Sequence, residues 1–173
     1  MPNFSRDFSQ FELSASQAAS LRADFTLLVP ETDLSRCSRV DRIIAEYKRV
    51  PGIYFWIMRQ GERLFSIYIG KTNSMAYRMQ NYVGEFQPHS PNDYKLRIFR
   101  AFLAESTPDA TLDLYFSSKD FSEITQAENI AVTAYDPLLN RRQRPSAQAR
   151  ADLRDAFSLY YRSAFEQLLQ NDG

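Results

Sequence analysis

The segment YIGKTNSMAYRMQNY, residues 68–82, groups polar side chains whose types and spacing could do chemistry. It reads as the end of a strand, a glycine turn that carries Lys71, and a helix that sets Arg78 and Tyr82 one turn apart. An arginine offers a planar fork to two oxygen atoms of an anion, which a lysine cannot do. A phenol, whose ordinary pKa is about 10, acts as a base only where a cation or a metal-bound water stabilises its phenolate. Tyr68, Lys71 and Arg78 are therefore a candidate site, which the neighbouring elements must position.

Two candidate strands precede this helix. GIYFWIM (52–58) and LFSIYIG (64–70) are rich in β-branched and aromatic residues, and the polar sequence RQGER joins them. A tight antiparallel hairpin would bring Tyr54 and Tyr68 to matching faces, close together. In the second strand, alternation predicts that the face opposite Tyr68 holds Phe65, Ile67 and Ile69.

The remaining pattern is mostly helical. Asn73 is the expected N-cap of the helix that holds Arg78. Asp120 and Glu123 form a capping-box pattern for a helix that stops before Pro137. TLDLYF, at 111–116, is a third strand. Apolar spacing predicts further helices over 14–28, 33–49, a segment opened by Ser90 and Pro91, and 145–169.

These elements predict an α+β fold, with a small three-stranded antiparallel or mixed sheet flanked by helices. All 173 residues are expected to form one compact domain. It would consist of a helical N-terminal extension over 1–50, a core over 51–142, and a C-terminal amphipathic helix over 143–173. With 44% hydrophobic and 14% aromatic residues, the composition is too apolar for a disordered chain.

The composition also excludes several classes of protein. One cysteine, Cys37, leaves neither a disulfide framework nor a cysteine-based zinc site, and we expect a reduced, cytoplasmic compartment. No apolar run is long enough to span a membrane, and no leader sequence is visible. Basic and acidic residues balance at 21 each, which argues against a protein that coats nucleic acid through net charge. The balance conceals a basic central segment, 59–100, and a basic sequence, RRQR, at 141–144.

The tripeptides GIY (52–54) and YIG (68–70), with the residues after them, resemble the GIY-YIG nuclease family. The family's helix arginine falls eight residues after the second glycine, which is Arg78 here. Its metal-binding glutamate matches Glu128 in QAENIAVTAY, and a downstream asparagine matches Asn140. The resemblance covers residues 50–142, with a connector between the tripeptides that is longer than usual. AENIAVTAYDPLLN also resembles the nuclease domain of the excision-repair incision subunit.

The resemblance implies a Mg²⁺-dependent endonuclease that hydrolyses phosphodiester bonds in DNA, and a fold of the GIY-YIG nuclease type. Tyr54 would be the general base or would position the attacking water. Tyr68 would hydrogen-bond the phosphate or the nucleophile, and Lys71 would stabilise the phenolate. Arg78 would bind the scissile phosphate through its fork.

Glu128 would hold one hydrated Mg²⁺, for which Mn²⁺ can substitute. Asn140 would orient the phosphate or fix the tip of the site. His89, without companion ligands, is interpreted as a loop residue. Candidate DNA contacts, which would position rather than specify the duplex, are Tyr82, Lys95, Arg97, Arg100, Arg141, Arg142 and Arg144.

The favoured subtype is a small sequence-specific type II restriction-like enzyme, acting as a homodimer beside a cognate methyltransferase. The alternatives are a nuclease toxin with an immunity protein, a structure-selective repair nuclease, and a non-catalytic DNA-binding module. Structural interpretations also stay open: Tyr54 and Tyr68 could be packing residues, and Glu128, which borders an apolar stripe, could form a structural ion pair. The sequence does not give the recognition sequence, the cut position or the preference between DNA and RNA.

Overall fold

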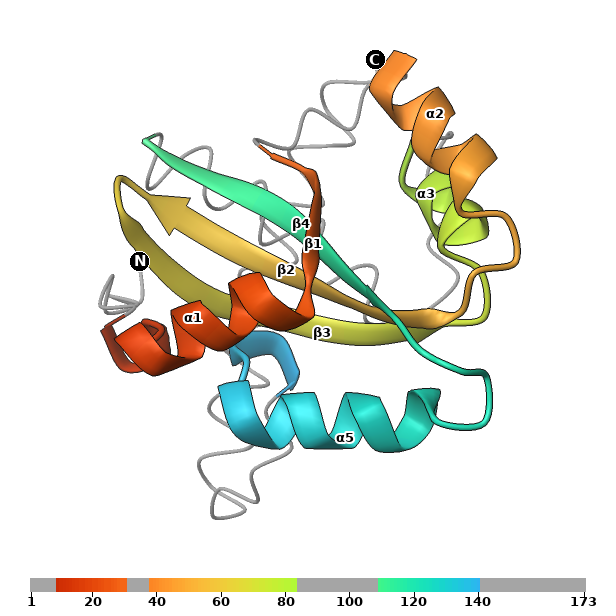
Figure 1. Cartoon of the computed structure of the whole chain (residues 1–173). Coiled ribbons are helices and arrows are strands. Elements are labelled where there is room, and N and C mark those ends of the chain that lie inside the picture. The colour runs from red at the N-terminus through yellow and green to blue at the C-terminus, as the bar shows by residue number, and fades with distance from the viewer. Residues whose placement is uncertain (1–8, 31–37, 84–108, 141–173) are drawn as a thin grey trace, which may run out of the picture.

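The computed structural model describes residues 9–30, 38–83 and 109–140 (Figure 1). No helix among these residues is long and apolar enough to cross a membrane. The helices expected after Ser90 and over 145–169 lie outside them. The elements are η1 Ser9–Phe11, α1 Ala15–Asp24, β1 Thr26–Val29, α2 Ser38–Glu46, β2 Gly52–Gln60, β3 Arg63–Thr72, α3 Met75–Val83, β4 Ala110–Ser118, α5 Ile124–Tyr135 and η2 Leu138–Asn140.

The sheet is antiparallel throughout, with the strand order β1-β4-β2-β3. The α+β class is confirmed, and β2, β3 and β4 are the three expected strands. The expected strand count is wrong, because the N-terminal extension contributes a fourth strand. The helix expected over 14–28 ends at Asp24, and Thr26–Val29 pairs with β4 instead. The position of Leu28 is compatible with the apolar spacing of a helix and with that of a strand, and only the pairing with β4 shows that the segment is a strand.

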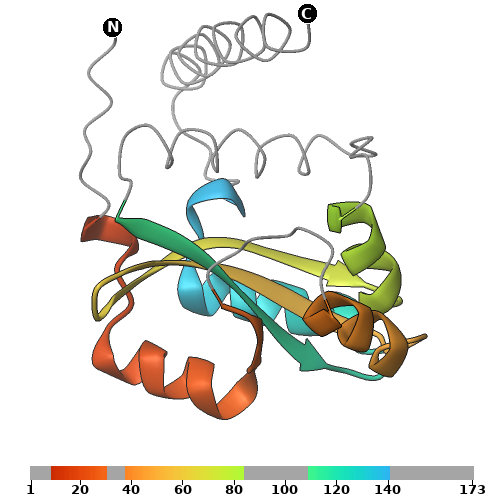
Figure 2. The same cartoon turned by 90° about the horizontal axis from the view of Figure 1, so that it is seen from above.

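Helices cover both faces of the sheet, as Figures 1 and 2 show. α2, α3 and η2 pack on the face that carries Tyr54, Trp56 and Tyr68, which we call the α2–α3 face. α1 and α5 pack on the opposite face, the α1–α5 face, which carries Phe55 and Ile69. Alternation along β2 predicted this division, and each face buries its own apolar cluster.

β3 departs from strict alternation at one residue. Trp56 and Ile57 are neighbours in β2, but their partners in β3 are Tyr68 and Ser66, so Ile67 is an additional residue that forms a β-bulge. Ile67 and Tyr68 therefore both join the apolar cluster of the α2–α3 face, although they are adjacent. The prediction that Phe65 and Ile67 lie on the face opposite Tyr68 is wrong for this reason, whereas Ile69 does lie on that opposite face.

Two helix starts also differ from the expected caps. Ser74, rather than Asn73, caps α3, because its hydroxyl accepts a hydrogen bond from the backbone N–H of Tyr77 at 3.3 Å. The capping box expected from Asp120 and Glu123 is not formed. Glu123 is itself the N-cap residue of α5, and its side chain makes no capping hydrogen bond.

Candidate active site

Three tyrosines and a tryptophan meet on the α2–α3 face. The ring centroid of Tyr54 lies 6.1 Å from that of Tyr68 and 6.3 Å from that of Tyr82. The side chains of Tyr54 and Tyr68 are hydrogen-bonded to each other. The indole Nε1 of Trp56 donates a hydrogen bond to the Tyr82 hydroxyl at 3.3 Å. The expected proximity of Tyr54 and Tyr68 is confirmed, and β2, β3 and α3 each contribute a phenol.

Both tripeptides contain glycine for a steric reason. Gly70 is the cross-strand partner of Tyr54, and a Cβ at Gly70 would overlap the Cζ and hydroxyl oxygen of Tyr54. A Cβ at Gly52 would overlap the carbonyl oxygen of Ser117 and the ring of Phe116. Glycine in β3 therefore allows the tip of the Tyr54 side chain to lie against the strand backbone, beside Tyr68.

Arg78 lies over the ring of Tyr54, with its Cζ 5.4 Å from the ring centroid. Its neighbour in α3, Met79, is fully buried in the cluster of the α2–α3 face, which holds this turn of the helix against the sheet. Arg78 itself is half-buried. The guanidinium is thus positioned at the rim of the tyrosine cluster, where it can meet an anion that approaches from solvent.

The pKa of Tyr68 is raised above its ordinary value. Burial raises the pKa most, Tyr54 and Glu128 raise it further, and Arg78 lowers it. Tyr68 therefore remains protonated over the ordinary pH range and can donate its hydroxyl hydrogen. Its hydrogen bond with Tyr54 also raises the pKa of Tyr68.

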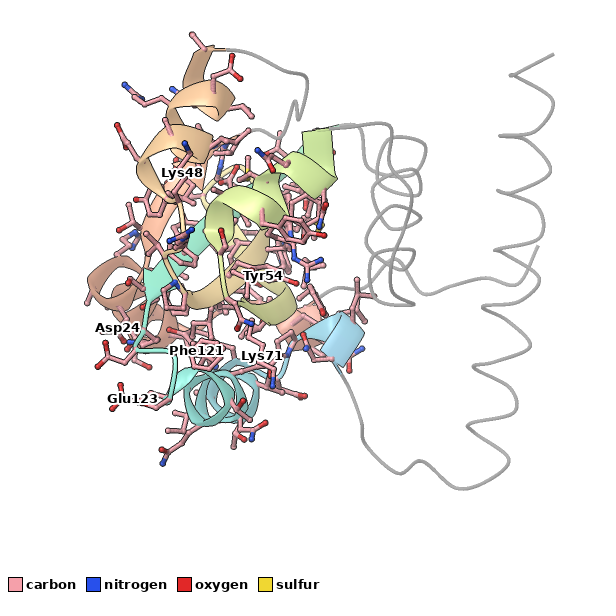
Figure 3. The ribbon with its side chains drawn as sticks, turned by 90° about the vertical axis from the view of Figure 1, so that its right-hand side faces the viewer. Asp24, Lys48, Tyr54, Lys71, Phe121 and Glu123 are labelled. Atoms are coloured by element: carbon pink, nitrogen blue, oxygen red, sulfur yellow. The ribbon has the colours of Figure 1, made fainter. Side chains whose placement is uncertain are left out.

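Glu128 reaches the end of β3 from α5. The Nζ of Lys71 lies 3.3 Å from Oε2 of Glu128, and it donates a hydrogen bond to the Thr125 hydroxyl at 3.1 Å. Figure 3 shows Lys71 beside α5, with Tyr54 farther toward α3. Lys71 was expected to stabilise the Tyr54 phenolate, but Arg78 is the cation at that ring. Thr125 was not predicted, although its spacing of three residues from Glu128 places it on the same helical face.

Asn140 closes the outer edge of β3. Its Nδ2 donates to the carbonyl oxygen of Ile69 and its Oδ1 accepts from the backbone N–H of Ile69, both at 2.7 Å. The Asn140 side chain thus makes the two hydrogen bonds to Ile69 that a neighbouring strand would make if β3 were not at the edge of the sheet. Two roles were predicted for Asn140: to orient the phosphate or to fix the tip of the site. Because the oxygen and the nitrogen of its amide are both bonded to the backbone of Ile69, the geometry favours the second role.

The donor set fits a hydrated Mg²⁺ held by one protein carboxylate. Among residues 9–30, 38–83 and 109–140, no three His, Cys, Asp or Glu side chains are grouped to hold a metal. Glu128 is the carboxylate at the site, and its side chain is 21% exposed. Mg²⁺ commonly takes one or two carboxylates and completes its shell with water and phosphate oxygens. The Lys71 side chain, 41% exposed, can move away from Glu128 without any repacking of the core.

The structure brings the predicted catalytic residues to the outer strand β3 from both faces of the sheet. Tyr54, Tyr68 and Arg78 lie on the α2–α3 face, while Lys71 and Glu128 meet beside α5. Tyr82, predicted as a DNA contact, is 8% exposed and bonded to Trp56. It is therefore a packing residue of the tyrosine cluster. The other predicted contacts, at positions 95, 97, 100, 141, 142 and 144, lie outside the described residues.

Neither a family model nor a curated protein sequence matches the chain. The structure is similar to solved structures of the GIY-YIG N-terminal endonuclease domain of UvrC from Thermotoga maritima. The magnesium-bound form is 19% identical, with a TM-score of 0.37, over 61% of this chain and 99% of that chain. Two point mutants bound to the catalytic divalent cation are 18% identical, with a TM-score of 0.38, over 62% and 100%. These solved structures are GIY-YIG domains, and the GIY and YIG motifs of this chain resemble the same family.

Proposed function

We propose that the chain is a Mg²⁺-dependent endonuclease that hydrolyses phosphodiester bonds in DNA. The observation that carries the proposal is the convergence of Tyr54, Tyr68, Arg78 and Glu128 at the outer strand of the sheet. Phosphodiester hydrolysis needs an aligned water, neutralisation of the charge that develops on the phosphate, and help for the leaving alkoxide. The four side chains match these needs in type and in position.

Tyr54 aligns the attacking water and accepts its proton. A phenol can do this only where negative charge on its oxygen is stabilised. The hydrogen bond from Tyr68 and the guanidinium over the ring both stabilise such a charge. Because the pKa of Tyr68 is raised, Tyr68 acts as the donor in this pair and not as a second base.

Arg78 binds two oxygens of the scissile phosphate through two N–H groups at one edge of its planar guanidinium. Its position over Tyr54 sets the phosphorus atom beside the phenol that aligns the water. Lys71 supplies a second cation on the α5 side of the site. The phosphate is therefore approached by positive charge from both α3 and the end of β3.

Glu128 would hold the Mg²⁺, and Lys71 is its counter-charge when the metal is not bound. When bound, the cation supplies neutralisation of the charge on the phosphate and on the leaving oxygen. Thr125 holds the Lys71 ammonium on the same helical face as Glu128. Lys71 and the metal would thus be alternative partners of the same partly exposed carboxylate.

Digestion of a supercoiled plasmid by the full chain tests this proposal. We expect nicking and linearisation with Mg²⁺ or Mn²⁺, and no cutting in EDTA. Short duplex DNA and RNA substrates, labelled at one end, establish the preferred nucleic acid. Absence of metal-dependent cutting on every one of these substrates would overturn the proposal.

We further propose a small sequence-specific, restriction-like enzyme as the subtype. Sequencing of the product ends is then expected to give discrete fragments that share one palindromic sequence, cut by a homodimer. A smear without a shared sequence supports the toxin alternative. Cutting confined to branched or bubble substrates supports the repair alternative, and tight binding without cutting supports a non-catalytic module.

A further inference from the structure

A surface with excess positive charge lies on α2 and the turn that follows it. α2 packs through Val40 and Ile43, which are buried in the cluster of the α2–α3 face. Every charged residue between positions 38 and 50 is exposed. The basic residues are Arg39, Arg42, Lys48 and Arg49, and the acidic residues are Asp41 and Glu46.

The turn after α2 is fastened to the start of α3. The backbone N–H of Met75 donates to the carbonyl oxygen of Val50 at 3.0 Å, and the N–H of Ala76 donates to that of Tyr47 at 3.2 Å. These bonds use two of the amides that a helix leaves unsatisfied at its N-terminus. The position of residues 47–50 is thereby fixed relative to α3.

Lys48 and Arg49 lie between the two carbonyls that accept these bonds. Arg78 follows the start of α3 by three residues, which is about 4.5 Å along the helix axis. The two cations of the turn and the proposed phosphate fork are therefore on one rigid unit. In Figure 3, Lys48, Tyr54 and Lys71 follow one another in this order from α2 toward α5, with Tyr54 in the interior.

Arg49 has a backbone φ of 55°, in the left-handed region. This conformation is unfavourable for an arginine and is adopted more readily by glycine or asparagine. The backbone of the turn therefore does not explain why an arginine stands at this position. A role for its side chain does.

Lys48 and Arg49 form no ion pair within the described residues, a property they share there with Arg22, Arg39, Arg42 and Lys119. Elsewhere in the described residues, three basic side chains have carboxylate partners: Arg59 with Asp113, Arg63 with Glu12, and Lys71 with Glu128. The charge of Lys48 and Arg49 is available to an external anion.

We propose that Lys48 and Arg49 bind the phosphate backbone of a DNA duplex beside the bond that is cut. The inference rests on the proposed function and extends it to the N-terminal extension. A duplex carries about one negative charge per 1.7 Å of its axis, so a duplex held at Arg78 offers phosphates to the adjoining turn. Such contacts fix the register and orientation of the duplex without reading its sequence.

The test compares two charge-matched double variants of the full chain. Lys48→Gln with Arg49→Asn removes the turn's cations, and asparagine tolerates the left-handed backbone. Arg22→Gln with Arg63→Gln removes the same charge from α1 and from the far end of β3. Binding to a labelled duplex is measured in EDTA, to prevent cutting, over a range of KCl concentrations. Melting temperatures establish that both variants fold.

The turn variant is expected to bind at least about tenfold more weakly at 0.1 M salt, with a slope of log Kd against log[salt] lower by about 2. The control variant should keep the wild-type slope. An unchanged slope in a folded turn variant, or an equal loss in the control, overturns the inference and leaves the nuclease proposal intact. A wild-type protein that neither binds nor cuts any duplex overturns both.

Discussion

The two faces of the sheet bury similar apolar clusters but carry opposite charge. On the α2–α3 face, five basic residues stand against two acidic ones: Arg39, Arg42, Lys48, Arg49 and Arg78 against Asp41 and Glu46. On the α1–α5 face, among α1, α5, the turns that flank α5 and the end of β3, three basic residues stand against five acidic ones: Arg22, Lys71 and Lys119 against Asp24, Asp120, Glu123, Glu128 and Asp136. A polyanion is therefore attracted to one face and repelled by the other.

The aromatic residues of the two faces also differ in what they do. Phe55 packs edge-on against Phe25 and Tyr135, with ring centroids 5.6 and 4.9 Å apart, which are ordinary core contacts. Its neighbour Tyr54 points to the other face, where its hydroxyl is bonded to Tyr68 beneath a guanidinium. Adjacent residues of one strand thus serve packing on one face and chemistry on the other.

A hollow on the α1–α5 face does not coincide with the candidate site. A cavity of about 560 Å³ on the α1–α5 face has Phe25 and Tyr135 among its lining, with Asp24, Lys119 and Glu123 also bordering it. None of the candidate catalytic residues lines it. The candidate site lies instead at the outer edge of β3, where the two faces meet. Glu128 reaches this edge from the α1–α5 face, and Tyr54 and Tyr68 reach it from the α2–α3 face.

Removing single hydroxyls from the two faces should give the largest contrast. Tyr54→Phe should slow cutting by roughly 100-fold to 10,000-fold, as expected for the loss of a general base. Tyr135→Phe should leave the rate within a factor of about two, since its ring packs in the core of the other face. Single-turnover cleavage rates measure both. Equal rates for the two variants would return Tyr54 to a packing role.

A charge-conserving change at the arginine should have the next largest effect. Arg78→Lys keeps the positive charge but cannot contact two phosphate oxygens, so cutting should slow by roughly 100-fold. Arg22→Lys, on α1, is the matched control and should cut like the wild type. If Arg78→Lys cuts within a few-fold of the wild-type rate, Arg78 is not the phosphate fork.

Two glycines of the hairpin should respond differently to an added side chain. Gly70→Ala should lower the free energy of unfolding by about 1–3 kcal/mol, because its Cβ overlaps the tip of Tyr54. At Gly61, where φ is 58°, an added Cβ would meet no other atom within 4 Å. Gly61→Asn should therefore change stability by less than about 0.5 kcal/mol, since asparagine tolerates the left-handed backbone. Urea denaturation compares them, and equal losses would remove the steric account of the YIG glycine.

The smallest effect concerns pH and tests the protonation of Tyr68. Its pKa is raised in the folded protein, so its stabilising contribution is complete below the ordinary tyrosine pKa of about 10 and is lost as pH rises above it. Over that range the contribution falls by about 1.4 kcal/mol per pH unit. Stability measured from pH 8 to 11 should therefore fall less steeply in Tyr68→Phe than in the wild type. Parallel curves would show that Tyr68 has no raised pKa.

Sequence patterns predicted the elements that carry their own periodicity. The β2–β3 hairpin, β4, α5 and the meeting of Tyr54 with Tyr68 follow from alternation and turn chemistry. β1 was missed because four residues next to a helix carry too short a pattern, and only pairing with β4 makes them a strand. The bulge at Ile67 is a property of two strands together, which one strand's alternation cannot reveal.

The same distinction holds within the site. The motif predicted which residue types converge, but not their partners. Lys71 pairs with Glu128 and Thr125 because the end of β3 runs beside α5, which is a tertiary contact. The pairing of Asn140 with the backbone of Ile69 depends on β3 being the outer strand, which the strand order decides.

Glu128→Gln tests the central claim most directly, because it removes the one charge that the metal requires while keeping size and hydrogen bonding. The ion pair with Lys71 is partly exposed, so its loss should cost less than about 1 kcal/mol and the variant should fold normally. We predict that the variant binds duplex DNA like the wild type, shows no Mg²⁺ binding by calorimetry at that duplex, and does not cut. A folded Glu128→Gln that binds Mg²⁺ and cuts at the wild-type rate would contradict the metal assignment and the mechanism built on it.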